Sequence, residues 1–188
     1  ALRYAPTIIS AAVVTHTLSR IGRSRATDLV WGYFGGLSEE KGVDLVLELI
    51  EKRIVHGRWV MCGSGTLHNA CQNAATRSNG GLQFFGALPE EQFAAVYETT
   101  DVIVNFHRSL SDLGDGVFPC KVLEAIAHGK VLVSTPLSGC PAAIGRATFW
   151  LDPRDEKDVR RVVGLVESRV FEASPALQDA LTWLLRPE

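Results

Sequence analysis

From residue 27 onward, short apolar runs alternate along the chain with segments whose apolar residues recur at helical spacing. β-Branched and aromatic residues dominate the short runs, and this alternation is typical of βα units around a parallel sheet. The predicted strands cover residues 28–34, 58–62, 82–85, 101–105, 131–134 and 148–151. The sequence therefore predicts an α/β fold, a doubly wound parallel sheet with helices on both faces.

Apolar stripes show which face of each predicted helix is buried. The stripes are Val43, Val46, Leu47 and Ile50; Phe93, Val96, Tyr97 and Thr100; Val122, Ala125, Ile126 and Gly129; Val159, Val162, Val163 and Val166; and Leu177, Ala180, Leu181 and Leu184. Asp152-Pro153 and Ser174-Pro175 each predict an N-cap followed by proline at the first helical position. We expect the chain to end as a helical pair packed on the sheet.

Composition narrows the class of protein. With 188 residues, 46% of them apolar, the chain has enough material for one ordinary domain with a real core. A net charge of −2 gives no basic stripe and argues against a nucleic-acid partner. The four cysteines and five histidines show no metal-ligand spacing and no disulfide framework, and there is neither a membrane-span run nor a signal-peptide pattern. These features predict a cytoplasmic domain without a metal.

Residues 1–25 stand apart from this pattern. They contain a strand-like run at 8–14, a short helical segment at 16–21 and then a basic loop. One interpretation is the tail of a missing N-terminal domain or a linker, which leaves 26–188 as the domain proper. The other is the first βα unit of the same sheet.

Three glycine-containing loops follow predicted strands, where the carboxyl ends of parallel strands form a ligand crevice. In the loop 35–42, backbone amides and the Lys41 ammonium are suited to a diphosphate, although a tight turn with a solvated lysine fits equally well. The loop 62–65 is expected to be a turn rather than a ligand contact. The main chain of 86–88 either reads a flat base or is simply a loop.

The stretch 114–130 places a glycine-rich loop before a helix between two buried strands. The first turn of such a helix offers unpaired N–H groups and a partial positive charge. Glu124 lies opposite the apolar stripe of this helix, so it accepts either the hydroxyls of a ribose or water. Four polar residues precede the helix, and the sequence assigns them no chemistry: His107, Arg108, Asp112 and Asp115.

Taken in order and at their intervals, these features resemble the C-terminal, donor-binding domain of retaining GT-B glycosyltransferases of the family 4 (group 1) type. The resemblance covers about residues 29–185. Its motifs are Phe34-Gly35-Gly36-Leu37 with Glu40-Lys41-Gly42, Gly63-Ser64-Gly65, Phe85-Gly86-Ala87-Leu88, and the run from Phe118 through Glu124 to Val133. It implies the Rossmann-like half of a GT-B fold.

The resemblance also implies a nucleotide-diphosphate sugar as substrate, with no cofactor and no metal. The base is expected against 86–88, the diphosphate near Gly36 and Lys41, and the ribose on Glu124. The donor-binding residues so implied are Gly35, Gly36, Lys41, Gly63, Gly86, Leu88, Val117, Phe118, Lys121 and Glu124. Lys41 is the first candidate for a catalytic role, in helping the diphosphate to leave.

Two positions depart from the family pattern. Gly36 stands where an arginine is usual, so half of the expected phosphate clamp is missing. Gly116 stands where a glutamate is usual, and Asp115, one residue earlier, is a candidate catalytic substitute. Lys121, in a Pro-x-Lys-x-x-Glu run seen in polysaccharide-assembly relatives, is a candidate for the missing positive charge.

The resemblance implies a hexosyltransferase that moves a sugar to a glycan or lipid-linked acceptor. That acceptor is expected on the missing N-terminal domain, so this fragment alone is expected to be inactive. The full-length enzyme is expected in the cytoplasm, with peripheral association at the inner face of the membrane left open. The alternatives are a nucleotide-binding module that has lost catalysis and a GT-B epimerase or phosphorylase. A dehydrogenase is disfavoured, because no Gly-x-Gly-x-x-Gly motif with an acidic residue about 20 positions on follows a strand.

Overall fold

The computed structural model describes residues 29–108, 119–169 and 175–184. The elements are β1 (Val30–Phe34), α2 (Val43–Glu51), β2 (Arg58–Cys62), α3 (His68–Arg77), β3 (Leu82–Gly86), α4 (Glu90–Glu98), β4 (Val102–Asn105), α5 (Cys120–Ala127), β5 (Val131–Ser134), α6 (Ala142–Ala147), β6 (Thr148–Trp150), α7 (Glu156–Arg169) and α8 (Pro175–Leu184). The predictions for residues 1–25, Asp112, Asp115, Gly116, Val117, Phe118 and Ser174 lie outside the described residues.

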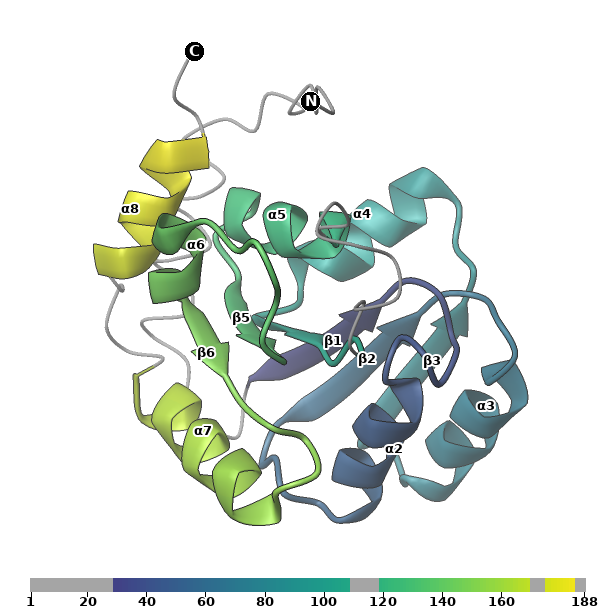
Figure 1. The fold of residues 1–188 in the computed structure, drawn as a ribbon. Coiled ribbons are helices and arrows are strands. Elements are labelled where there is room, and N and C mark those ends of the chain that lie inside the picture. The colour runs from purple at the N-terminus through teal and green to yellow at the C-terminus, as the bar shows by residue number, and fades with distance from the viewer. Residues whose placement is uncertain (1–28, 109–118, 170–174, 185–188) are drawn as a thin grey trace.

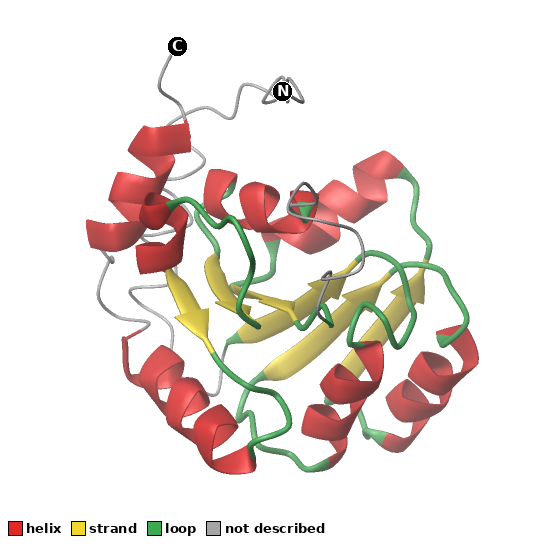
Figure 2. Ribbon diagram, viewed as in Figure 1, coloured by secondary structure: helices red, strands yellow, loops and turns green. Residues whose placement is uncertain are grey.

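In the described part of the chain, six strands form one parallel sheet in the order β3-β2-β1-β4-β5-β6 (Figure 2). Each lies within two residues of its predicted range, so the predicted doubly wound α/β fold is confirmed. Strand β1 is central, and its Trp31 pairs with Trp59 of β2 on one side and Val102 of β4 on the other. The strand order reverses between β1 and β4, and such a switch point is where open α/β sheets bind ligands.

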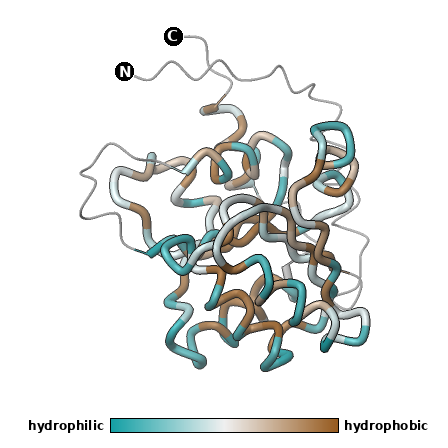
Figure 3. The backbone as a smooth tube through the Cα atoms, turned by 90° about the vertical axis from the view of Figure 1, so that its right-hand side faces the viewer, coloured by the Kyte–Doolittle hydropathy of each residue, from teal (hydrophilic) through white to brown (hydrophobic). Residues whose placement is uncertain are grey.

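Helices cover both faces of the sheet. Figure 1 shows α2, α3 and α7 on one face and α4, α5, α6 and α8 on the other. Side chains of β1 alternate between the two layers, because Trp31 belongs to the core under α2 and α7 whereas Phe34 belongs to the core under α4 and α5. Hydrophobic segments run through the interior and hydrophilic ones lie at the surface turns (Figure 3).

Two predicted helix starts have different outcomes. Pro175 is the first residue of α8, as expected. The prediction of Asp152 as the N-cap of α7 is wrong, because that helix begins at Glu156. The Asp155 carboxylate accepts the N–H of Lys157 at 3.0 Å and so provides the cap, while the Asp152 carboxylate accepts the N–H of Arg154 and closes a turn.

Among the described residues, no helix combines the length and apolar character needed to cross a membrane.

Candidate functional site

Hydrogen bonds join the loops after β1, β2 and β3 at the carboxyl edge of the sheet. The N–H of Gly35 donates to the carbonyl of Cys62 at 3.1 Å, and the N–H of Gly63 donates to the carbonyl of Gly86 at 2.8 Å. Gly63 has a φ of 153°, and a Cβ there would overlap the carbonyl oxygen of Gly35. Gly63 therefore lets two loops touch, which agrees with the interpretation of this loop as a turn.

Gly42 packs the loop after β1 against the end of β4. It adopts a left-handed conformation with φ 72°, and a Cβ there would overlap the carbonyl oxygen of Phe106. The N–H groups of Gly42 and Val43 donate to carbonyls of the same loop. These two amides are thus engaged within the turn, and the charge that this loop presents comes from the Lys41 side chain.

A cavity of about 320 Å³ lies where β1 and β4 end. Its lining comes from the loop after β1, from α4, from the residue after β4 and from the start of α5. The lining residues are Phe34, Gly35, Gly36, Lys41, Phe93, His107, Pro119, Cys120, Lys121 and Glu124. Five of the predicted donor-binding residues, Gly35, Gly36, Lys41, Lys121 and Glu124, therefore surround one cavity at the switch point.

Lys41 is held by a histidine that follows β4. Its Nζ lies 2.7 Å from Nε2 of His107 and 3.4 Å from Oε1 of Glu40. Nδ1 of His107 lies 2.9 Å from the carbonyl oxygen of Arg108, so Nδ1 carries the proton and Nε2 accepts from the Lys41 ammonium. Burial lowers the pKa of His107, and the nearby Lys41 charge lowers it further, so both effects favour this neutral ring.

Lys121 enters the cavity from the first turn of α5. Its Nζ lies 4.1 Å from the centre of the Tyr33 ring. That nitrogen is buried, and among the described residues it has no hydrogen-bond partner. Burial and, to a lesser extent, the Lys41 charge lower the pKa of Lys121 to about 7, and Glu124 opposes the change. A Cβ at Gly35 would lie 3.5 Å from this Nζ, so the Lys121 side chain reaches the loop after β1.

Glu124 lines the cavity from the same helix. The buried face of α5 consists of Val122, Ala125 and Ile126, and Glu124 is only half-buried. The prediction that Glu124 lies off the packed stripe is confirmed. Among the described residues no side chain caps the N-terminus of α5 at Pro119, and the start of this helix presents its positive dipole end to the cavity.

Three of the predicted donor-binding residues that the structure describes, Gly63, Gly86 and Leu88, do not line this cavity. The carbonyl of Gly86 accepts the Gly63 amide, and Leu88 packs against the core under α4 and α5. The base position at residues 86–88 stays a prediction. Val117 and Phe118, together with Asp115, lie outside the described residues.

His107 and Cys120 were not assigned a role from sequence. His107 lies in the segment after β4 and Lys41 lies in the loop after β1, and these two strands are neighbours in the sheet. That placement indicates a contact between His107 and Lys41 only once the strand order is known. Cys120 is exposed, begins α5 and stands at the mouth of the cavity, and its position in the Pro-x-Lys-x-x-Glu run was the available signal.

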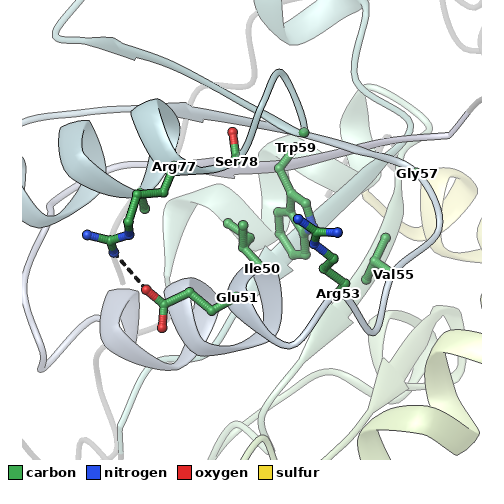
Figure 4. Close-up of a pocket in the computed structure, with 10 residues that line it drawn as sticks. Ile50, Glu51, Arg53, Val55, Gly57, Trp59, Arg77 and Ser78 are labelled. Carbon is green, nitrogen blue, oxygen red and sulfur yellow. Dashed lines mark hydrogen bonds and ion pairs between the residues drawn. The ribbon is translucent and has the colours of Figure 1, made fainter.

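A second cavity, of about 360 Å³, lies at the opposite edge of the sheet (Figure 4). It sits between the C-terminal ends of α2 and α3, where helix carbonyls disfavour anions. The Arg77 guanidinium there is paired with Glu51 at 2.8 Å, and Arg53 and Trp59 also line this cavity. The cavity at the switch point is smaller, but it alone of these two combines two lysines with a carboxylate.

Comparisons with known proteins give matches at the level of the family and of the fold. The sequence model of the family described as "Glycosyl transferases group 1" matches residues 28–167. A curated relative from Campylobacter jejuni, N,N'-diacetylbacillosaminyl-diphospho-undecaprenol alpha-1,3-N-acetylgalactosaminyltransferase, is 28% identical over 131 residues. The match covers 66% of this chain, which spans only 33% of the relative's length.

Two solved structures show the same fold. HepE of Anabaena, in complex with UDP-glucose, has a TM-score of 0.63 and 15% identity over 93% of this chain and 48% of its own. The catalytic domain of cholesterol-alpha-glucosyltransferase from Helicobacter pylori has a TM-score of 0.60 and 17% identity over 84% of this chain and 97% of its own. At these identities the likeness concerns the fold.

Proposed function

Because this chain belongs to the group 1 glycosyl transferases, we propose that it is the donor-binding part of a retaining glycosyltransferase. Its substrate in this proposal is a nucleotide-diphosphate sugar, and its acceptor is a glycan or a lipid-linked saccharide. The observation that carries the proposal is the cavity at the switch point, where Lys41, Lys121 and Glu124 meet.

The cavity has the chemistry that a nucleoside diphosphate needs. Two lysines provide donors and positive charge for the phosphates, together with the N-terminus of α5. Glu124 provides acceptor oxygens for the two ribose hydroxyls. The main chain of 86–88 is proposed for the base. This segment lies at the end of β3, two strands from β1 and at the same carboxyl edge of the sheet.

The reaction in this proposal breaks the bond between the anomeric carbon and the β-phosphate oxygen. The acceptor hydroxyl oxygen forms the new bond to that carbon on the same face, and its proton passes to the leaving diphosphate. The electron pair stays on the leaving diphosphate, where Lys41 and Lys121 stabilise the new charge. His107 is a positioning residue in this proposal, because its Nε2 lies 2.7 Å from the Lys41 ammonium. Two ammonium groups then take the part that a divalent cation plays elsewhere, and no cofactor is required.

The acceptor side of the proposal rests on the curated relative, whose printed name describes transfer to a diphospho-undecaprenol-linked saccharide. This chain spans a third of that relative's length. We propose that a separate N-terminal domain binds the acceptor, with the full enzyme in the cytoplasm and peripherally associated with the membrane that holds a lipid-linked acceptor. Transfer is then expected only when both domains are present.

A second candidate is a nucleotide-binding module without catalysis. The observation that favours it is the exposed Gly36 in the cavity, which contributes no charged side chain to the clamp. Both candidates predict nucleotide binding. An assay of sugar transfer with this chain joined to an acceptor domain distinguishes them, because only the transferase candidate predicts transfer.

Calorimetric titration of this chain with UDP, GDP and ADP tests the shared prediction. We expect saturable binding of one nucleotide, on the order of micromolar for about 25 heavy atoms at roughly 0.3 kcal/mol each. Lys41→Ala and Glu124→Ala should each weaken binding by about 10- to 100-fold, the value of a charge-assisted hydrogen bond.

Two exposed residues away from the cavity provide matched controls. Lys157→Ala on α7 and Glu51→Ala at the C-terminal end of α2 remove the same charges and should leave binding unchanged. If none of the three nucleotides binds at millimolar concentration, the proposed function is wrong for this chain.

A further inference from the structure

Lys121 carries a buried amino group whose hydrogen-bonding capacity is not used by the described residues. Its Nζ is buried, contacts the face of the Tyr33 ring and finds no hydrogen-bond acceptor among those residues. An ammonium group has three N–H donors, and burying them without acceptors is costly. The side chain therefore stands ready for an acceptor that arrives from outside the chain.

A second buried lysine on the same side of the sheet shows the contrast. Lys130, just after α5, is 0% exposed, and its Nζ donates to the carbonyl of Glu98 at 3.1 Å, at the C-terminus of α4. That position offers a carbonyl and the negative end of a helix dipole. Lys130 is thus held by the fold, whereas Lys121 is aimed into the cavity.

The charges around Lys121 favour its neutral form. From the loop after β1 it faces the Lys41 cation, from the end of β4 the neutral His107, and from β1 the un-ionised Tyr33 ring. From its own helix it faces Glu124, the single negative charge among these described neighbours. A second ammonium beside Lys41 in a buried place repels the first, and desolvation adds to the cost.

Building on the proposed function, we propose that above pH 7 Lys121 is a neutral amine until ligand binds, and that it takes up a proton from solvent as the diphosphate binds. Lys121 thereby becomes the second cation of the phosphate clamp, in the place left by Gly36. The balance is simple, because one proton moves from the buffer to Nζ and no bond in the ligand breaks.

The linkage follows from charge. Burial lowers the pKa of Lys121 to about 7 in the unliganded chain. A diphosphate with about three negative charges against Nζ favours the ammonium and raises that pKa again. The bound state holds one more proton than the unliganded chain. The affinity for the diphosphate must therefore fall as the pH rises above the pKa of Lys121 in the unliganded chain.

Calorimetry in two buffers tests proton uptake. We would titrate the whole chain with the nucleoside diphosphate that binds, at pH 7, 8 and 9, in buffers with different ionisation enthalpies. Uptake of about 0.9 proton per ligand is expected at pH 8 and about half a proton at pH 7. The dissociation constant should rise about 50-fold between pH 7 and pH 9. The ligand's terminal phosphate has a second pKa of about 6, so it is about nine-tenths ionised at pH 7 and contributes no proton at pH 8 and 9.

Substitutions assign the proton to this residue. Lys121→Arg keeps a charge that does not titrate, so it should bind with uptake near zero and with an affinity independent of pH from 7 to 9. Lys121→Met should bind weakly, also without uptake. Lys130→Met is the matched control and should keep the uptake of the unmodified chain.

The outcomes separate this inference from the function on which it rests. Binding of a nucleotide without proton uptake by the unmodified chain would overturn the role of Lys121 and leave the donor site intact. Uptake that persists in Lys121→Arg would overturn it as well. Failure of every nucleoside diphosphate to bind would instead overturn the proposed function.

Discussion

The ammonium of Lys41 donates a 2.7 Å hydrogen bond to Nε2 of His107. This bond links the loop after β1 to the residue that follows β4, across the switch point of the sheet. Gly42 makes the link possible, because the absence of a Cβ lets its loop lie against Phe106. The position of the Lys41 charge is therefore set by two neighbouring strands rather than by its own loop.

Removing the His107 ring should leave the Lys41 ammonium less firmly positioned at the cavity. His107→Ala is expected to weaken nucleotide binding by about tenfold, which corresponds to one hydrogen bond to a charged group. His107→Gln can still offer an acceptor oxygen and should lose less. Calorimetry gives the affinity, and urea unfolding of both variants shows whether the loss is only structural. Unchanged affinity in His107→Ala would argue against a positioning role.

The tautomer of His107 can be checked without a ligand. Burial and the Lys41 charge lower the pKa of His107, so the ring should stay neutral as the pH falls through its ordinary value of about 6.5. Protonation would turn Nε2 into a donor and break the bond to Lys41. Nitrogen NMR of the ring should therefore show a protonated Nδ1 and an unprotonated Nε2 at pH 6.5. A ring that is half protonated there would contradict the assignment.

Gly63 should tolerate no side chain. In Gly63→Ala the new Cβ meets the Gly35 carbonyl at a backbone conformation that L residues rarely adopt, and the free energy of unfolding should fall by about 2 kcal/mol or more. Gly164→Ala is the matched control. Gly164 lies on the exposed side of α7 with open space around it, so alanine should stabilise by about 0.5–1 kcal/mol. Urea denaturation measures the free energy of unfolding of both variants. Equal changes in Gly63→Ala and Gly164→Ala would contradict the packing argument.

The strands and the buried helix faces could be predicted from sequence, because spacing of apolar residues records burial directly. The position of Glu124 off the core stripe followed from the same spacing. Strand order is carried by no local pattern, so the Lys41–His107 contact could not be predicted. The cap of α7 was misassigned because Asp152 and Asp155 are both able to cap, and the intervening turn decides between them.

Cys120 offers a reporter of the cavity. It is exposed, whereas burial raises the pKa of the Cys62 and Cys71 thiols to about 11 and also raises that of Cys140. Iodoacetamide at pH 8 should therefore alkylate Cys120 first, since the thiolate is the reacting form. A nucleoside diphosphate in the cavity should slow this alkylation. Mass spectrometry follows it, with Cys120→Ser as the control, and equal rates with and without nucleotide would place the ligand elsewhere.

Lys121 should make the stability of the unliganded chain depend on pH. Its pKa is lowered to about 7 in the folded chain, whereas a lysine in the unfolded chain has a pKa of about 10.4. Between these values the unfolded chain binds more protons, so the free energy of unfolding rises with pH, by at most about 1.4 kcal/mol per pH unit. Below pH 7 both states are protonated and the cost of the buried charge is present in full.

Lys121→Met removes this cost and its pH dependence. The variant should exceed the unmodified chain in stability most clearly at pH 6.5, and the difference should shrink by pH 8.5. Urea unfolding at pH 6.5, 7.5 and 8.5 measures it. The series stops at 8.5, because the raised pKa values of the Cys62 and Cys71 thiols lower stability at higher pH, where the unfolded chain loses these protons first. A difference that stays constant across the series would mean that Lys121 keeps its proton in the folded chain.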